Sequence, residues 1–149
     1  MADRSTIIKD LLFFLKNDLD LNITDPVSSS RGSSSKFIMT SFPEREVKYP
    51  LITLEVNNYE ATRAGMQSTN MDVTLAVEIR IWSKSVAQSD KLTQEILDRL
   101  ADIQFTTTTG SIANDFHDFN IASAVRVDEP GQGGIKSRII QLNYRFFNL

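Results

Sequence analysis

The sequence predicts an α+β fold: an antiparallel or mixed β-sheet of four to five strands with two α-helices packed on one face. Residues 71–82 alternate apolar and polar side chains, which is the period of a strand with one buried face. Residues 5–20 and 85–103 instead repeat apolar side chains at spacings of three and four, which is typical of amphipathic helices. Each element then has an apolar face to bury, and layering helices on a sheet buries both.

Composition narrows the class of protein. The chain has 149 residues, a formal net charge of -3 and no cysteine. This length fits a single domain, residues 1–149. The near-balanced charge provides no electrostatic footprint for nucleic acid or an anionic membrane, and the lack of cysteine excludes a disulfide framework and thiolate metal sites. Because charges interrupt every apolar run, we expect a soluble chain without a signal peptide or membrane span.

The first element is the helix at residues 5–20, for which Asp3 or Ser5 can cap the first free amides. Phe13 and Phe14 widen its apolar stripe beyond what one flat sheet needs. Either both rings reach core neighbours, or one of them packs on another chain. The stripe itself consists of Ile7, Ile8, Leu11, Leu12, Leu15 and Leu19.

A serine-rich segment at about residues 26–36 follows, and its composition predicts a flexible loop. Loops of this length are uncommon in compact domains unless they have a function. The segment therefore either becomes ordered against a partner or is a loop tip without a role. Residues 36–41 could form a short strand, with Phe37 and Met39 on one face, before a charged extended connection.

Two longer strands are predicted at residues 49–59 and 71–82. The connection between them is too long for a tight turn, but it permits a hairpin with a projecting loop. Arg63 and Met66 would be exposed in that loop, where a contact surface is one interpretation and ordinary solvation is the other.

After Trp82 the period changes to that of a helix. Ser85 is the expected cap, with Gln88 as its capping-box partner. Carboxylates lie on the opposite side of this helix from the apolar stripe, among basic neighbours, so a solvated face explains them better than catalysis does. The apolar stripe consists of Leu92, Ile96, Leu97, Leu100 and Ile103.

The last two strands are predicted at residues 121–127 and 135–147, joined by an acidic, glycine-rich turn. Ile121, Ser123, Val125 and Val127 alternate along the first of them. In the second, Ile140, Leu142, Tyr144 and Phe146 share one face, whereas Ile139, Gln141, Asn143, Arg145 and Phe147 share the other.

No motif for catalysis emerges. His117 is the only histidine, and it cannot easily join Asp115 and Asp118 on one metal ion without a sharp turn of the backbone. No serine has a nucleophile-elbow setting, and the glycines at 131–134 lead into a strand rather than a phosphate-binding helix. We therefore expect no enzyme activity, no catalytic residue, no metal and no cofactor. A small enzyme built on Asp115, His117 and Asp118 is the less favoured alternative.

Several stretches, taken in order, resemble tail terminator (tail completion) proteins of long-tailed bacteriophages. They are the leading amphipathic helix, YPLI at residues 49–52, VTLAVEIRIWSKS at 73–85, SDKLTQEILDRL at 89–100, and a closing strand after an acidic turn. The resemblance covers most of the chain, although its motifs are patterns with few fixed residues. The serine-rich insertion before YPLI departs from the pattern and leaves the tail lineage open.

The resemblance implies a structural virion protein that forms a ring, typically hexameric, on the head-proximal end of the tail tube. Such a ring stops tube polymerisation at the length set by the tape measure protein and provides the head-tail joining surface. The implied partners are further copies of the chain, the tail tube protein and a head-completion or connector protein, with the tape measure protein as a further candidate. No membrane or sequence-specific nucleic acid is implied, although DNA would pass through the ring.

The implied location is the tail or neck of the virion, after assembly in the host cytoplasm. Another neck component, such as a head-completion or connector protein, is the alternative. Each subunit of a closed ring needs two different complementary patches, and mixed charges fix their register. For Trp82, a half-buried position covering the sheet end is equally compatible. The candidate residues for subunit or tube contacts are Arg63, Met66, Glu78, Arg80, Trp82, Arg138 and Arg145.

Overall fold

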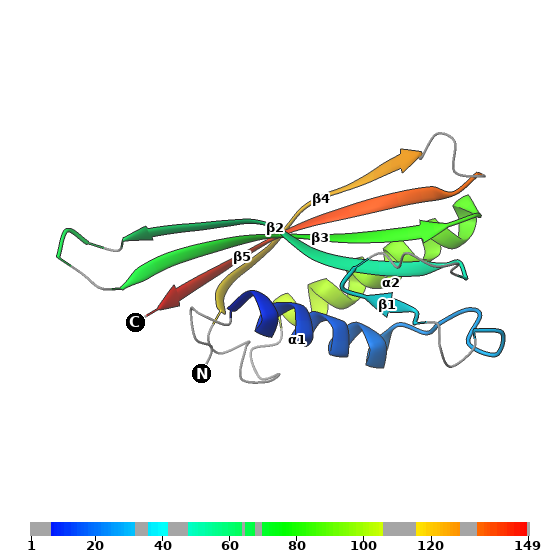
Figure 1. The fold of residues 1–149 in the computed structure, drawn as a ribbon, viewed down its shortest axis with the longest axis horizontal. Coiled ribbons are helices and arrows are strands. Elements are labelled where there is room, and N and C mark those ends of the chain that lie inside the picture. The colour runs from blue at the N-terminus through cyan, green and yellow to red at the C-terminus, as the bar shows by residue number, and fades with distance from the viewer. Residues whose placement is uncertain are drawn as a thin grey trace.

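The computed structural model describes residues 7–31, 36–41, 48–63, 65–67, 70–105, 116–128 and 134–148. One five-stranded mixed sheet forms one layer, and both helices lie on the same side of it (Figure 1). The predicted fold class and order of elements are therefore confirmed. In chain order the elements are α1 (Ile7–Asn22), β1 (Ile38–Met39), β2 (Leu51–Arg63), β3 (Met71–Ser83), α2 (Val86–Phe105), β4 (Phe116–Asp128) and β5 (Lys136–Asn148).

The strands lie in the order β1-β2-β3-β5-β4, which places β3 at the centre. The short strand β1 pairs with β2 in parallel, and all the longer neighbours pair antiparallel. The alternation that predicts β3 is present in three dimensions, because one face of the strand is fully buried under the helices. The buried residues on that face are Val73, Leu75, Val77, Ile79 and Ile81.

The helices cover this apolar face with the stripes that their spacing predicts. On α1, Ile7, Leu11, Leu15 and Leu19 are buried; on α2, Leu92, Ile96, Leu100 and Ile103 are. Two side chains differ from simple helical periodicity, since Ile8 is 41% exposed and Leu12 is only partly buried. The two phenylalanines differ: Phe14 packs against the core, whereas Phe13 is 64% exposed, and the packing of Phe13 on another chain stays a prediction.

The start of α2 is capped by a relay of two serines. The Ser85 hydroxyl accepts a hydrogen bond from the Gln88 amide at 3.4 Å, as predicted for an N-cap. In a capping box the Gln88 side chain would accept from the backbone N–H of Ser85. Here that N–H donates to the Ser83 hydroxyl at 3.1 Å, and the Ser83 hydroxyl in turn donates to the Gln88 side-chain oxygen at 3.1 Å. The reciprocal capping box is therefore replaced by a bridge through Ser83.

Hydrogen bonds from Arg31 link the segment at residues 25–31 to the residues just before β2. Its guanidinium donates to both carboxylate oxygens of Asp25, at 2.6 and 3.1 Å, and to the carbonyl oxygens of Lys48, at 2.9 Å, and Pro50. It also lies 5.2 Å from the ring centroid of Phe37. Only 4% of its side chain is exposed, so the buried guanidinium has lost its hydration. These hydrogen bonds compensate for that loss. The flexibility predicted for the whole serine-rich segment stays a prediction.

Irregularities in strand pairing change which side chains share a face. The register of β2 shifts between Val56 and Asn58, and that of β4 shifts between Phe116 and Asp118 and again between Ile121 and Ser123. Ile121 consequently pairs with Leu142 and packs against the core. Val125, by contrast, pairs with Ile139 and is 51% exposed. The uninterrupted alternation predicted for residues 121–127 is therefore wrong, because one extra residue in a strand reverses the faces that follow it.

The long strands also extend beyond their predicted limits. β2 runs to Arg63, which pairs with Met71, so β2 and β3 form a hairpin that reaches beyond both helices (Figure 1, green). β4 begins at Phe116, within a segment predicted only to be polar. The predictions for Asp3, Ser5, Asp115 and residues 131–133, and for the side chains of His117 and Asp118, fall outside the described residues.

Candidate functional site

Within the described parts of the chain, no group of three or more His, Cys, Asp or Glu side chains is arranged to hold a metal ion. Neither described helix has the combination of length and apolarity that a membrane crossing requires. The candidate site is instead the sheet face opposite the helices, which we call the outer face. It is built on the alternate residues of β3: Asp72, Thr74, Ala76, Glu78, Arg80 and Trp82.

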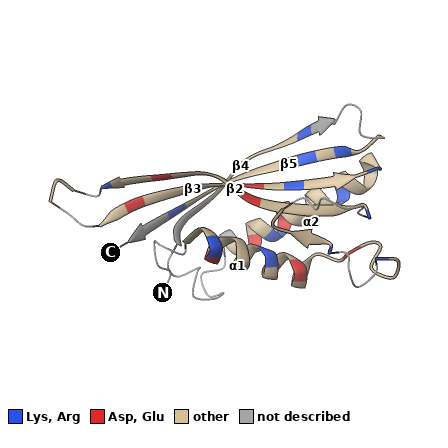
Figure 2. Ribbon diagram, viewed as in Figure 1, with Lys and Arg blue, Asp and Glu red and all other residues tan. Residues whose placement is uncertain are grey.

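Charged residues of both signs lie along these strands, including the projecting end of the β2–β3 hairpin (Figure 2). On the outer face, Glu78 occupies the middle of β3 and is only 9% exposed. Its carboxylate accepts a hydrogen bond from the Asn57 amide at 2.7 Å and pairs with Arg80 Nε at 3.2 Å. Burial of this carboxylate is thus offset by two polar partners on the same face.

Trp82 continues this cluster toward the end of the strand. Its indole N–H donates to the Thr53 hydroxyl on β2 at 3.1 Å. The Arg80 guanidinium lies over its ring, 4.9 Å from the centroid. On the neighbouring strand β5, its register partner Ser137 is fully buried. Trp82 is therefore half-buried and held by its neighbours, as the alternative interpretation proposes, while its exposed part remains open to contact.

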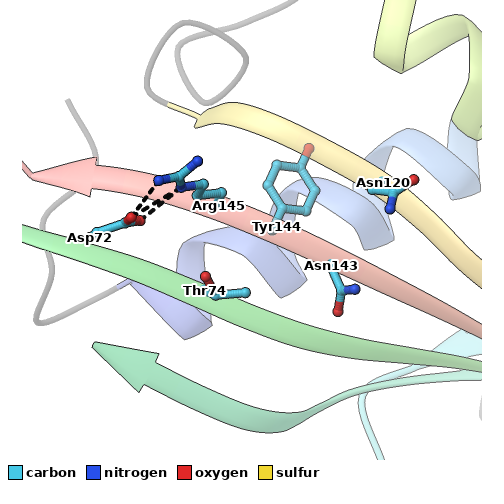
Figure 3. A pocket seen from close by; sticks show the side chains of 6 residues that line it. All are labelled: Asp72, Thr74, Asn120, Asn143, Tyr144 and Arg145. Atoms are coloured by element: carbon cyan, nitrogen blue, oxygen red, sulfur yellow. Dashed lines mark hydrogen bonds and ion pairs between the residues drawn. The ribbon is translucent and has the colours of Figure 1, made fainter. Parts of the chain in front are cut away.

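A second polar group lies on the outer face, nearer the hairpin end. Arg145 on β5 donates to Asp72 on β3 through Nε at 3.0 Å and Nη2 at 2.6 Å (Figure 3). The hydrogen bond from Arg145 holds the pKa of the Asp72 carboxyl below its usual value. The pair borders an open groove of about 450 Å³, lined by Asp72, Thr74, Asn120, Asn143, Tyr144 and Arg145.

This groove does not have the properties of a catalytic pocket. Its polar lining consists mainly of a hydroxyl, two amides and an ion pair whose charges already neutralise one another. Tyr144 adds no reactive group to the groove, because it pairs in register with Leu75 on the helix side of the sheet and is only 2% exposed; burial also raises the pKa of its hydroxyl. The groove can accept hydrogen bonds and donate them, so it suits recognition of a polar surface.

Arg138 lies on the helix side of the sheet, opposite the outer face. It pairs with Ile81 in register, which places it on the helix side, and its guanidinium donates to Asp90 on α2. Arg138 and Arg145 thus belong to opposite faces of β5, because their positions along the strand differ by an odd number. Any contact through Arg138 would be made beside α2 and would compete with Asp90.

Arg63 and Met66 lie together at the projecting end of the hairpin. Arg63 is the last residue of β2 and is exposed, and Met66 in the connecting turn is 96% exposed. The extended strands, rather than a long loop, carry them away from the helices.

The seven predicted contact residues therefore form three groups. Glu78, Arg80 and Trp82 make one cluster, with Arg145 farther along the same face; Arg63 and Met66 occupy the hairpin end; and Arg138 lies beside α2. Sequence reasoning missed three residues that hold the outer face together, namely Thr53, Asn57 and Asp72. Alternation alone places Thr53 and Asp72 on polar faces, but only the strand register shows which side chains meet.

No family model matches the chain, and no curated protein does. Among solved structures, the chain is similar to a component of a structure described as the virion of a native gene transfer agent particle. That similarity has a TM-score of 0.63 at 10% sequence identity, and it covers 95% of this chain and 98% of the other. At this identity the similarity establishes a shared fold over almost the whole of both chains.

Proposed function

We propose that the chain is a structural virion protein, and specifically a tail terminator. It assembles into a ring of six copies, the number typical of that family, on the head-proximal end of a tail tube. There it ends tube polymerisation and provides the surface that joins the tail to the head. The observation that carries the proposal is the end-to-end similarity in fold with a component of a gene transfer agent virion.

The distribution of polar side chains supports an assembly role rather than catalysis. The outer face carries charged groups that are already paired, such as Glu78 with Arg80 and Asp72 with Arg145. Paired charges add little affinity for a partner, but a partner bound in the wrong position would meet like charges and bind less tightly. A terminator requires this kind of specificity. It must match the last tube ring on one side and refuse another tube subunit on the other.

The hairpin end supplies the most exposed of the predicted contacts. Met66 can adapt to an irregular apolar surface, and Arg63 beside it can pair with a carboxylate. A partner bound there would meet a side chain that is 96% exposed in the isolated chain. In our proposal this end reaches the tail tube or the neighbouring subunit, while the Glu78–Arg80–Trp82 cluster keeps the outer face rigid.

Native mass spectrometry of the purified chain, over a range of concentration and salt, is the first test. A dominant six-subunit species supports the proposal, and electron microscopy should then show the ring on isolated tail ends. A chain that stays monomeric alone and also fails to bind tail tubes overturns it. A ring that binds portal complexes but never tail tubes would instead identify another neck component.

The hairpin end can be tested with the double variant Arg63→Glu and Met66→Asp. Both side chains are exposed, so the monomer should fold normally. The variant should lose tube binding or ring formation, whereas Lys91→Glu, an exposed change on α2, should keep both. Arg80→Glu and Arg138→Glu are less direct tests, because each also breaks an internal pair, with Glu78 or Asp90.

A further inference from the structure

The sheet ends on one side in β4, a long strand that among the described residues has a partner along one edge only. β4 pairs with β5 and is the last strand in the sheet order. Its other edge presents the row of amide and carbonyl groups that an additional strand would pair with. Side chains on both of its faces are exposed: Asn120, Ala122, Ala124, Val125 and Arg126.

The composition of this edge does not discourage pairing. Residues 120–125 read NIASAV, without a charge or a proline. Soluble proteins usually interrupt a long edge strand with such residues, because an uncharged edge strand without proline can pair with other strands. Within residues 120–126 the pairing with β5 is interrupted at the register shift between Ile121 and Ser123, and it is regular again from Ser123. This edge therefore has the properties of a surface that is covered in the assembled protein.

The opposite side of the sheet has a second open edge. β1 pairs with β2 only at Ile52 and Thr53. Beyond that point β2 continues for ten residues to Arg63, and among the described residues no strand pairs with this part of its outer edge. Its residues 57–63 are exposed and contain no proline. The part of the chain that the structure describes thus has two open strand edges.

We infer that residues 120–126 of β4 pair with residues 57–63 of β2 in a neighbouring copy, so that the sheets of adjacent subunits continue into one another. This inference rests on the proposed ring. β2 and β4 run in opposite directions within the sheet, because antiparallel pairings lead from β2 through β3 and β5 to β4. Rotation about an axis along the strands preserves those directions, so the two edges meet as an antiparallel pair.

The main competing occupant of the β4 edge is the β4 edge of a second copy. That pairing has two-fold symmetry and closes as a dimer, which leaves the β2 edge of both copies open. Pairing β4 with β2 instead covers both edges of every copy. It is also a contact between two different surfaces, which is the type that closes into a ring.

Two substitutions block the β4 edge without disturbing the fold. Ala122 has no register partner on β5, so Ala122→Pro places a proline in the irregularity, where strands tolerate it. Val125→Lys adds a charge at a position that is 51% exposed. We expect each to raise the concentration at which the ring dissociates by about tenfold or more, with an unchanged monomer melting temperature. Ala87→Lys, at an exposed position of α2, is the matched control and should leave the ring intact.

Hydrogen exchange on the wild-type chain provides a readout that does not depend on substitutions. Amides in residues 120–126 and 57–63 should both become protected when dilute monomer is concentrated into the ring. Protection of residues 120–126 alone, together with a dimer, would show β4 pairing with itself and overturn the inference. A ring that survives both substitutions would overturn the inference and leave the proposed function standing. A ring joined through these edges that never binds tail tubes would support the inference and contradict the proposed function.

Discussion

Arg99 on α2 and Asp18 on α1 form a two-pronged ion pair that joins the two helices. Arg99 donates through Nε to one carboxylate oxygen at 2.7 Å and through Nη2 to the other at 2.8 Å. The side chains are 24% and 11% exposed, so the pair is largely shielded from water. The hydrogen bond to Asp18 raises the pKa of Arg99. The pair therefore adds a direct link between two helices that both pack on the sheet.

Replacing Asp18 with Asn should lower the free energy of unfolding by about 1–2 kcal/mol, because Arg99 would lose a charged acceptor in a partly buried position. Denaturant unfolding of the monomer measures the change. The matched control is Gln94→Ala, which removes an exposed hydrogen bond to Asp98 on the same helix and should change stability by less than about 0.5 kcal/mol. Equal effects of the two substitutions would contradict a structural role for the pair.

Arg31→Lys should destabilise the protein by about 2 kcal/mol, although it keeps the charge. A lysine cannot donate simultaneously to both oxygens of Asp25 and to the carbonyls of Lys48 and Pro50, so buried acceptors lose their partners. Thermal unfolding measures the loss. The same substitution at Arg63 is the control and should have little effect on the monomer, since the Arg63 side chain is exposed.

The Asp72–Arg145 pair should make a small, acid-sensitive contribution to stability. The folded-state pKa of Asp72 lies below the ordinary 3.8. The contribution is therefore present above pH 3.8 and is lost as the pH falls through the lowered pKa. Because the Arg145 side chain is 51% exposed, solvent screening should keep it below about 1 kcal/mol.

A carbon-13 NMR titration of the Asp72 carboxyl group measures this pKa directly. In the Arg145→Gln variant it should return toward 3.8, because the main cause of the shift is removed. An unchanged titration in the variant would mean that another group holds the pKa down.

The adjacent phenylalanines of α1 should separate stability from assembly. Phe14→Ala should cost about 2 kcal/mol in monomer unfolding, because Phe14 packs against the core. Phe13→Gln should change it by less than about 0.5 kcal/mol, since Phe13 is 64% exposed, and should instead weaken ring formation. Denaturant unfolding and native mass spectrometry measure the two effects. Full ring stability in Phe13→Gln would remove Phe13 from the contact surface.

Much of this fold is predictable because its core residues recur in the sequence with either the two-residue period of a strand or the period of about 3.6 residues of a helix. The alternation through Val73, Val77 and Ile81 requires a half-buried strand, and the spacing of Leu92, Ile96 and Leu100 requires an amphipathic helix. The extra residues in β2 and β4 were not predictable, since neither carries a glycine or proline at that point. Such irregularities depend on how neighbouring strands twist and pack.

The candidate site shows the same division. Exposure of Met66 and the alternate facing of Arg138 and Arg145 follow from local pattern alone. Local pattern does not show which side chains contact one another. Asn57 contacts Glu78 only because two strands pair, and Arg99 contacts Asp18 only because two helices pack together.

The sequence by itself determined the kinds of element, their order and the apolar face that each one buries, because these depend on contacts between residues close along the chain. Only the tertiary structure decided the central place of β3, the faces of residues beyond each irregularity, the partners of the buried charges and the two open sheet edges. These features depend on distant segments that lie next to each other after folding, and the free energy of each contact depends on what the neighbouring segment supplies.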